Sequence, residues 1–492
     1  MTIRHIAILL LLGLLIPSSF CLLAQTDSCG ITWDNIIQIS HDTSFSVVPR
    51  VVATGDTIHI LWFGTELGNG EGIQYSHSFD GGQTFSPQTQ LVSYDSARGN
   101  RGLLAASGSH LCMVYHALVD SPAYSNLGIL CSINAGVSWQ PRVIIGEYAL
   151  GAVAARDSNV YVYVNYSVAP GVIRGGLIAS HDCGNTWNMV NDALPVQGGN
   201  PSIVVTSVGM HIVRTQAIVA GDQEVFYLRS TDFGLTWSVQ ETLSVRDGIT
   251  SDQPVMAADD SGNIYVAWRD GKYGSIDGFH ASVILRKSSD NGTSWGGEQL
   301  LTSTPTALRP RISRSNAKIV VAWNEYVDYY TDRPFVRLST NEALSWCDTT
   351  SAGSFGIGVD ISLENELLHL VWSNDAWVPD GDVFYQRGTI GGPVFVREGM
   401  NPKPNEYQLE QNYPNPFNSR TIIKYSIPHR DRVSIRLYDL LGRIVETLYE
   451  GNQEMGNHVI DFDSENLSSG VYLLVLEPSS YSSVVRKLMI IK

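Results

Sequence analysis

The first 390 residues repeat a pattern of short apolar runs separated by polar and glycine-rich positions. The run Thr57–Trp62 recurs as Asn263–Trp268, Lys318–Trp323 and Leu367–Trp372. Runs of this length, apolar throughout or alternating with polar residues, are typical of β-strands, and glycine-rich segments between them are typical of turns. The pattern predicts an all-β fold built from repeated groups of four strands.

A second pattern, Ser-x-Asp/Asn-x-x-x-Thr/Ser-aromatic, occurs six times downstream of a predicted strand pair, and we call each copy a box. Neighbouring boxes are roughly 50 residues apart, a period typical of solenoids and propellers. Short Asp and Ser side chains hydrogen-bond backbone amides in tight turns, glycine permits positive φ, and the aromatic residue supplies buried area. We therefore interpret the box residues as structural. Their Asp or Asn positions are Asp80, Asn134, Asp182, Asp232, Asp290 and Asn341.

The boxes resemble the Asp-box, or bacterial neuraminidase repeat, of sialidase-like proteins. This resemblance implies a β-propeller in which each box joins the third and fourth strands of a blade, on the face away from the ligand. In the sixth box Ala343 replaces the usual glycine, so we expect a distorted turn there.

The last strand group has no box after it, whereas Gly30–Ile39 resembles the end of a box and the strand that follows. We therefore predict that Ile31–Ile39 lies beside Asp382–Gln386 and closes the ring, which removes exposed sheet edges. This arrangement predicts seven blades. Six blades, the number in the sialidases of the family, is the alternative.

The C-terminal region resembles the type A sorting domain of type IX secretion through Tyr413–Asn418, Leu437–Arg443, Leu467–Tyr472 and Lys487–Lys492. Its short alternating strands predict a small immunoglobulin-like β-sandwich. The resemblance implies that the partner of residues 407–492 is the type IX secretion machinery. It also implies export through the periplasm of a Gram-negative bacterium, followed by release or attachment to the outer surface.

The N-terminus has the features of a cleaved signal peptide, with Arg4 before the apolar run Ile6–Ile16 and a cleavage point after Ala24. The run is too short to span a bilayer, and no later segment reaches 18 apolar residues, so we expect no transmembrane segment in the mature chain. The predicted organisation is a signal peptide at 1–24, the propeller at 25–390, a linker at 391–406 and the sorting domain at 407–492.

Charge and cysteine content narrow the choice of partners. The net charge of −16 argues against nucleic acid as a partner. No Cys-x-x-Cys pair is present, and we expect neither a metal nor a cofactor. Cys112 and Cys131 lie on neighbouring predicted strands, so a disulfide between them and buried free thiols are both open.

Candidate site residues lie on the ligand face, in the loops that precede the first strand and follow the second strand of each blade. Sialidases grip a carboxylate with arginines and use a Tyr–Glu nucleophile with an Asp acid/base. By position, the candidate carboxylate ligands are Arg50, Arg269 and Arg309, the sugar platform is Trp377, and the catalytic candidates are Tyr326, Glu325 and Asp270.

Two departures from the family, a missing motif and the apparent seventh blade, favour binding over catalysis. The Arg-Ile-Pro motif of the family is absent, and the nearest element, Pro49-Arg50-Val51, reverses its order. Adjacent Glu325 and Tyr326 should also point to opposite faces of a strand. We therefore favour a secreted or cell-surface propeller that binds glycans or proteins. An exo-sialidase or other glycoside hydrolase, and a structural envelope protein, are the alternatives, since fold similarity does not decide among them.

Overall fold

The protein is described by a computed structural model that covers residues 29–491 except 42–44, 67–69, 118–125, 147, 170–171, 195–198, 220–221, 274–280, 303, 329–330, 354–355, 375–380, 392–406, 410, 413–414, 454–455, 465–466 and 480–482. The predicted signal peptide, nearly all of the predicted linker and Trp377 lie outside the described residues. The described chain is almost entirely β-structure, with one short 3₁₀ helix at Gly271–Tyr273.

Antiparallel sheets follow one another along the first part of the chain. A seven-stranded sheet contains, in order, β3 (Phe45–Thr54), β4 (Thr57–Glu66), β5 (Gly70–Ser78), β6 (Thr89–Ser107), β7 (His110–Ala117), β8 (Asn126–Ser132) and β9 (Val143–Ile145). The next two sheets have four strands each: β10 (Tyr148–Arg156), β11 (Asn159–Ala169), β12 (Val172–Ser180) and β13 (Asn188–Leu194), then β14 (Ser202–Thr206), β15 (Gly209–Val219), β16 (Asp222–Ser230) and β17 (Glu241–Thr242).

Two more four-stranded sheets and a closing sheet complete this part of the chain. The four-stranded sheets are β18 (Ser251–Ala258), β19 (Ile264–Asp270), β20 (Ser282–Ser288) and β21 (Gln299–Leu300), then β22 (Ala307–Ser315), β23 (Lys318–Asp328), β24 (Thr331–Ser339) and β25 (Thr350–Ser351). The closing sheet joins β26 (Ile357–Glu364), β27 (Leu367–Ser373) and β28 (Val383–Ile390) to the N-terminal strands β1 (Ile31–Trp33) and β2 (Ile37–Gln38).

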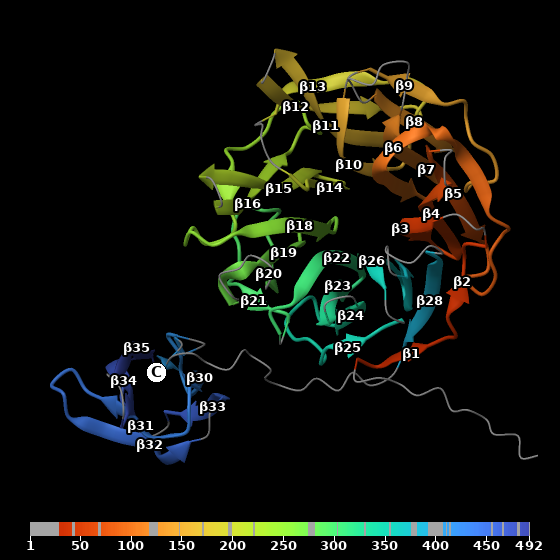
Figure 1. Ribbon diagram of the computed structural model, residues 1–492. Helices are drawn as coiled ribbons and strands as arrows, with labels where there is room; N and C mark the ends of the chain where they lie inside the picture. The colour runs from red at the N-terminus through yellow and green to blue at the C-terminus, as the bar shows by residue number, and fades with distance from the viewer. Residues whose placement is uncertain are drawn as a thin grey trace, which may run out of the picture.

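The sheets form a propeller. The innermost strands contact one another in the cyclic order β3, β6, β10, β14, β18, β22 and β26, and β26 contacts β3 again (Figure 1). β6 is the outer strand of the first four-stranded unit and the inner strand of the second, so we number the blades by counting β6 twice. We interpret this order as the seven blades that the sequence predicts. The all-β propeller fold is confirmed.

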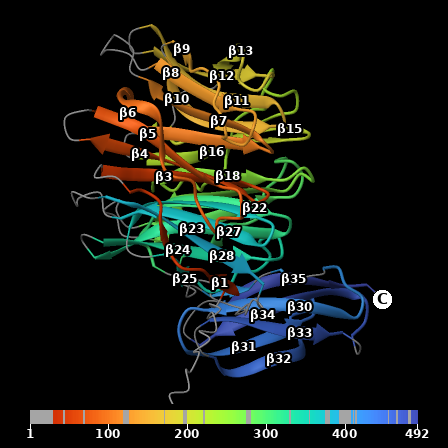
Figure 2. The ribbon, with the colours of Figure 1, turned by 90° about the vertical axis from the view of Figure 1, so that its right-hand side faces the viewer.

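The N-terminal segment closes the ring as predicted. Ile31 pairs with Ile390 and Ile37 with Tyr385, so β1 and β2 add to the outer edge of β28. Figure 2 shows β1 beside β28. A disulfide between Cys29 and Cys347 ties this segment to the sixth blade. The Cys112–Cys131 disulfide that the sequence leaves open is also present, and it joins β7 to β8.

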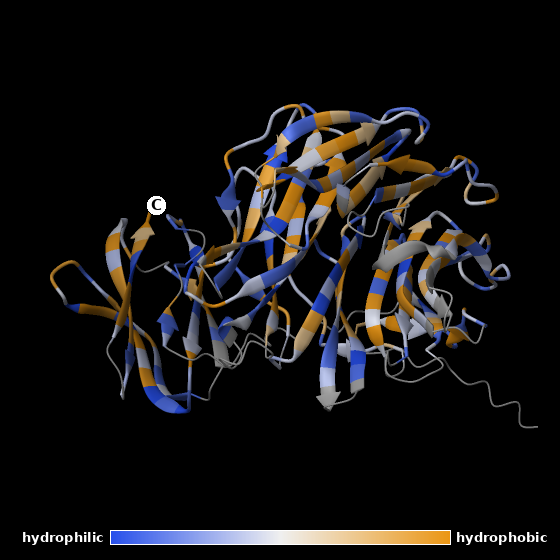
Figure 3. Ribbon diagram, turned by 45° about the horizontal axis from the view of Figure 1, so that its top comes forward, coloured by the Kyte–Doolittle hydropathy of each residue, from blue (hydrophilic) through white to orange (hydrophobic). Residues whose placement is uncertain are grey.

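Alternating hydrophobic and hydrophilic residues run along the strands (Figure 3). The apolar side chains pack between neighbouring sheets. Four tryptophans at the same place in the second strand of their blades are fully buried: Trp62, Trp268, Trp323 and Trp372. Burial of such large side chains between blades is the main stabilising contribution that the repeated apolar runs provide.

A separate β-sandwich follows. One sheet has the order β29 (Gln408–Leu409), β30 (Arg420–Ile427) and β33 (Gly456–Asp463), and the other β32 (Ile444–Gln453), β31 (Asp431–Tyr438), β34 (Gly470–Pro478) and β35 (Val484–Ile490). The segment around Asn415 is pinned to the last strand, because its side chain donates to Lys487 O at 3.0 Å and accepts from Met489 N at 2.8 Å. The predicted sandwich is confirmed.

Candidate functional site

The boxes lie on one face of the propeller, and the innermost strands begin on the other. Boxes contact the turns between the first and second strands of their own blades, as in the bond from Gly81 N to Asp56 O at 2.9 Å. The end of each innermost strand therefore lies on the box face, and its beginning lies on the opposite face. The predicted ligand face is this opposite face.

Innermost strands change register near their beginnings. β3 shifts between Val47 and Arg50, and β22 shifts between Leu308 and Arg311. Each shift contains a residue of positive φ before a proline, Val48 in β3 and Arg309 in β22. Such bulges re-aim the side chains that follow, and they place Arg50 and Arg311 at equivalent positions, opposite Leu61 and Ala322.

Asp360 of β26 lies between these two arginines. Its carboxylate accepts from Arg311 Nε at 3.0 Å and from the backbone N–H of Val51 at 3.1 Å. Each arginine also donates from Nη1 to the carbonyl of the proline before it, at 2.9 Å in both strands. Blades one, six and seven are thus joined at this point of the ring.

The electrostatics identify an arginine cluster, which we define as Arg50, Arg309 and Arg311. The pKa of Arg50 is lowered to about 10, first by burial and then by the charges of Arg311 and Arg309, against which Asp360 acts in the opposite direction. Asp360 thus acts on both Arg50 and Arg311, while Arg309 adds a further positive charge near Arg50. A bound anion would relieve their mutual repulsion.

Arg269, the third predicted arginine, lies outside this cluster. Its Nε and Nη2 donate to the two oxygens of Asp252 at 2.7 and 2.8 Å, a bidentate ion pair that uses its guanidinium within the fifth blade. Arg311 takes its place beside Arg50 and Arg309. The signal for Arg311 in the sequence is the Pro-Arg pair that Pro49-Arg50 and Pro310-Arg311 share.

Asp270 and Glu325 stand at equivalent positions, two residues after a buried tryptophan. Asp270 accepts from the indole of Trp268 at 3.0 Å, and Glu325 accepts from the indole of Trp323 at 2.7 Å. A hydroxyl group donates to each carboxylate as well, from Ser251 and Thr304 respectively, both at 3.0 Å. Both carboxylates therefore satisfy buried donors, and burial raises the pKa of Glu325.

Tyr326 is half exposed and follows Glu325 along β23. Adjacent residues of a strand point to opposite faces, and Glu325 directs its carboxylate to Trp323 and Thr304. The structure therefore does not bring Tyr326 and Glu325 together as a nucleophile and its base.

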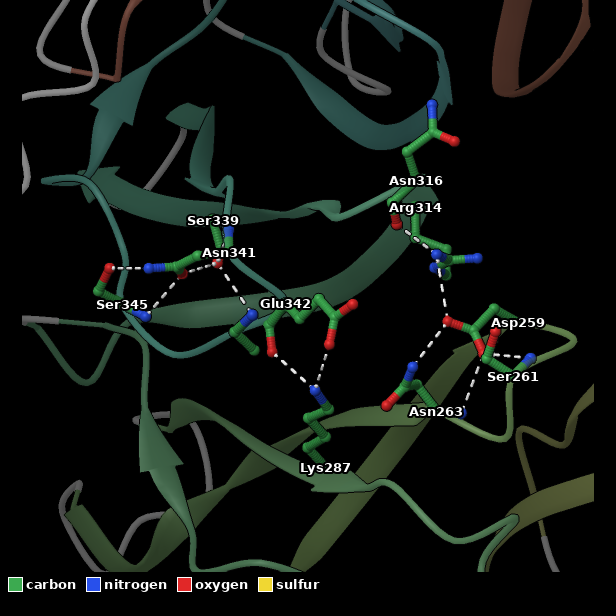
Figure 4. Close-up of polar contacts among 11 residues, drawn as sticks. Asp259, Ser261, Asn263, Lys287, Arg314, Asn316, Ser339, Asn341, Glu342 and Ser345 are labelled. Carbon is green, nitrogen blue, oxygen red and sulfur yellow. Dashed lines mark hydrogen bonds and ion pairs between the residues drawn. The ribbon is translucent and has the colours of Figure 1, made fainter.

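The box face is rich in polar contacts that hold the backbone (Figure 4). In the sixth box, Asn341 Oδ1 accepts from Ser345 N at 3.0 Å, and Ser339 Oγ accepts from Ala343 N at 2.9 Å. Ala343 has a φ of 64°, in the same left-handed region as the corresponding glycines of the other boxes, so the distortion expected there is absent.

The turn that begins at Asp259 is also structural (Figure 4). Its carboxylate accepts from Ser261 N and Asn263 N at 2.8 and 3.0 Å and pairs with Arg314 Nη2 at 3.2 Å. Across the described residues, no group of three or more His, Cys, Asp and Glu side chains is placed to hold a metal ion. The described part of the chain also contains no apolar helix of membrane-spanning length.

Solved structures similar to this chain have low identity to it. A protein of unknown function from Dyadobacter fermentans has 11% identity and a TM-score of 0.45, with coverage of 74% of this chain and 100% of that one. The α-L-arabinanase of Penicillium chrysogenum complexed with arabinobiose has 12% identity and a TM-score of 0.46, with coverage of 73% and 99%. Trypanosoma rangeli sialidase has 11% identity and a TM-score of 0.43, with coverage of 90% and 84%.

No curated protein matches the sequence significantly. The C-terminal residues 411–492 match the family described as the secretion system C-terminal sorting domain. This match coincides with the β-sandwich and with the segment pinned to its last strand. Residues 411–492 are thus a sorting domain of the type IX secretion family, and the chain that carries it is an exported protein.

Proposed function

We propose that this exported propeller binds an anionic ligand, an acidic glycan being the first candidate, through Arg50, Arg309 and Arg311. The observation that carries the proposal is the arginine cluster itself, in which two neighbouring positive charges help to lower the pKa of Arg50. A chain with a net charge of −16 concentrates positive charge at this point of the ligand face. Guanidinium groups bind carboxylates and sulfates through paired hydrogen bonds.

Binding without hydrolysis is favoured because the candidate catalytic groups have other partners. Asp270 and Glu325 accept from buried indoles, and Tyr326 is not paired with Glu325. Glycosidases need two carboxyl groups free to flank the scissile bond. An exo-sialidase or other glycoside hydrolase, and a structural envelope protein, are the alternatives that the experiments below address.

The remaining parts of the chain fit the same proposal. Residues 1–24 are the signal peptide, 25–390 the propeller, 391–406 the linker and 407–492 the region that engages the type IX secretion machinery. The protein is then released or held at the outer surface. Trp377, which lies outside the described residues, keeps its place in this proposal as the sugar-stacking residue predicted from the sequence, and the box residues keep their structural role.

The arginine cluster is tested by binding of acidic and neutral oligosaccharides of equal length to the purified protein. We expect binding of the acidic set only, with an affinity that falls as salt is added. Arg50→Gln and Arg311→Gln should each weaken binding by about tenfold, since each removes a charge-assisted hydrogen bond. Arg174→Gln, at an exposed arginine outside the cluster, is the matched control. Equal losses in all three variants contradict the proposal.

Hydrolysis is tested separately with a fluorogenic sialoside and a small panel of glycosides. We expect no product from the wild-type protein. Turnover that Tyr326→Phe or Asp270→Asn abolishes would replace the binding proposal with the hydrolase alternative.

A further inference from the structure

Ser244 ties the connection between the fourth and fifth blades to the strand beside it. This connection, residues 243–250, leads from β17 to the start of β18 on the ligand face. Leu243 N donates to Val225 O and Val225 N donates to Ser244 Oγ, both at 2.8 Å. The hydroxyl of Ser244 in turn donates to a carboxyl oxygen of Glu224. Leu243 and Ser244 are buried, so the connection is held to β16 at its first two residues.

The closing blade has the same arrangement with a different carboxyl group. Val383 N donates to Ser40 Oγ at 2.9 Å, and the hydroxyl of Ser40 donates to Asp382 Oδ1 at 3.0 Å. Asp382, like Glu224, immediately precedes the valine. Asp382 is partly exposed, however, whereas Glu224 is fully buried. The two blades therefore differ in the access of water to the carboxyl group that completes the arrangement.

Glu224 is an acid in surroundings that oppose its ionisation. One of its carboxyl oxygens, Oε1, has no hydrogen-bond partner, and the other accepts from Ser244. The charges of three further carboxyl groups act on it, those of Asp222 on the same strand, Asp247 in the connection and Asp270 in the fifth blade. The pKa of Glu224 is raised from 4.5 to about 7, first by burial, against which the bond from Ser244 acts, and then by these three charges.

The basic side chains of the connection, of β15 and of the helix after Asp270 have other partners. Arg246 is the basic residue of the connection, Arg214 lies on β15, and Lys272 lies in the 3₁₀ helix. Their hydrogen-bonded or ion-paired partners are Thr242 for Arg246, Gln216, Gln240 and Tyr163 for Arg214, and Glu298 for Lys272. An ionised Glu224 is therefore a buried charge acted on by like charges, which is strongly destabilising.

We propose that Glu224 makes residues 243–250 a pH-sensitive latch between the fourth and fifth blades. With its proton the carboxyl group stays buried, and the latch stays closed on β16. Without the proton the carboxylate gains hydration when Ser244 and the rest of the latch move away from it, so the latch opens locally. The latch leads into β18, where Gln253 Oε1 accepts from the backbone N–H of Arg309 at 2.9 Å, so it joins the strand that contacts the arginine cluster. Its test does not depend on ligand binding.

The direction of the pH effect follows from the raised pKa of Glu224. The closed latch binds the proton more tightly than the open latch, in which the carboxyl group has its ordinary pKa of 4.5. The stability of the closed latch is therefore greatest below pH 4.5, falls as the pH rises to about 7, and is constant above that pH. Between pH 5 and pH 7 we expect opening to become more frequent by at least about tenfold.

Hydrogen exchange of the purified protein measures this opening at the amides of Val225 and Leu243, after correction for the intrinsic effect of pH on exchange. Their protection should fall between pH 5 and pH 7 in the wild-type protein. In Glu224→Gln, which has an uncharged group of the same shape, their protection should be independent of pH. All other titrating groups are shared by the two proteins, so the difference between them isolates Glu224. Protection that is constant in the wild-type protein, or that falls equally in the variant, overturns the proposal.

Two further variants separate the latch from general effects of substitution. Asp382→Asn is the matched control, and it should leave the pH dependence at Val225 and Leu243 unchanged. Ser244→Ala removes the bond that favours the ionised carboxylate, so the fall in protection should move to higher pH. This variant also serves if Glu224→Gln does not fold. A fall that stays at the same pH in Ser244→Ala, or that Asp382→Asn shifts, contradicts the latch.

Discussion

At the residue scale, each box depends on two consecutive positions in the left-handed region of φ. In the fifth box these are Asn291 and Gly292, with φ of 59° and 73°. A Cβ atom at Gly292 would overlap the hydroxyl of Tyr227, which belongs to the preceding blade. The glycine is therefore required for two reasons, its backbone conformation and the close approach of the neighbouring blade.

The two reasons are separable by experiment. Gly55 also has a positive φ, of 59°, but a Cβ atom there would meet no other atom within 4 Å. Gly55→Ala should lower the free energy of unfolding by about 1 kcal/mol through backbone strain alone. Gly292→Ala should lower it by about 3 kcal/mol, because overpacking adds to the strain. Urea unfolding measures both, and equal losses would show that the contact with Tyr227 is unimportant.

Three blades contain the same buried histidine–tyrosine pair. His59, His211 and His369 are each fully buried, and Nδ1 of each lies 2.7 to 2.8 Å from a tyrosine hydroxyl on the next strand. Burial lowers the pKa of these histidines from 6.5 to about 3, 4 and 3 respectively. The folded protein therefore keeps them neutral.

This arrangement predicts a loss of stability in mild acid. Between pH 6.5 and 4 the unfolded chain binds protons that the buried histidines do not, so the free energy of unfolding falls as the pH falls. Each histidine accounts for up to about 3 kcal/mol of this loss. His211→Gln should reduce the slope of unfolding free energy against pH, measured by urea unfolding. His181→Gln, at an exposed histidine, is the control, and an unchanged slope in His211→Gln contradicts the prediction.

At the scale of elements, the strand groups and the closure of the ring are predictable from the sequence, and so are Arg50 and Arg309 as site residues, whereas the membership of Arg311 in the arginine cluster is not. Apolar runs and boxes predict the strands directly. The likeness of Gly30–Ile39 to the end of a box predicts its pairing with β28, which the structure contains. The bulges at Val48 and Arg309 each add a residue to the strand. The side chains beyond the bulge therefore no longer follow the two-residue alternation that is used to predict their direction from the sequence. These bulges determine which side chains of blades one, six and seven meet. Sequence position alone therefore names Arg269 as a ligand candidate and misses Arg311.

One type of turn occurs in both domains with different surfaces. Asp259 and Asp439 each accept from the backbone N–H groups two and four residues later, at 2.8 to 3.0 Å. The middle residues are Asp260 and Ser261 in the propeller but Leu440 and Leu441 in the sorting domain. These leucines are 69% and 78% exposed. Because the turn itself does not need them, we predict that this exposed apolar pair contacts another molecule during export.

We expect Leu440→Asn with Leu441→Asn to lower export while leaving the fold intact. The free energy of unfolding should change by less than about 0.5 kcal/mol, since both side chains are exposed. The fraction of protein outside a cell that has the type IX machinery, compared with the fraction in the periplasm, measures export. Leu344→Asn, at a leucine of the propeller that is 82% exposed, is the control. Normal export of the double variant would rule out a role for this turn.

At the scale of the whole molecule, the ring is closed by non-covalent pairing and by one covalent bond. β1 and β2 pair with β28, and the disulfide from Cys29 to Cys347 spans 318 residues of sequence. Both sulfur-bearing side chains are fully buried in the core between the sixth and last blades. The N-terminal end of the propeller is thereby held to the sixth blade independently of the strand pairing.

Because a disulfide stabilises by restricting the unfolded chain, its contribution grows with the loop it closes. Removal of Cys29 and Cys347 as a Ser/Ser pair should lower the free energy of unfolding by about 5 kcal/mol. The Cys112–Cys131 disulfide, with a sequence separation of 19, is the matched comparison, and its Ser/Ser variant should lose about 3 kcal/mol. Guanidinium unfolding followed by tryptophan fluorescence measures both variants. A larger loss from the short loop than from the long one would mean that local packing, rather than closure of the ring, determines what these disulfides contribute.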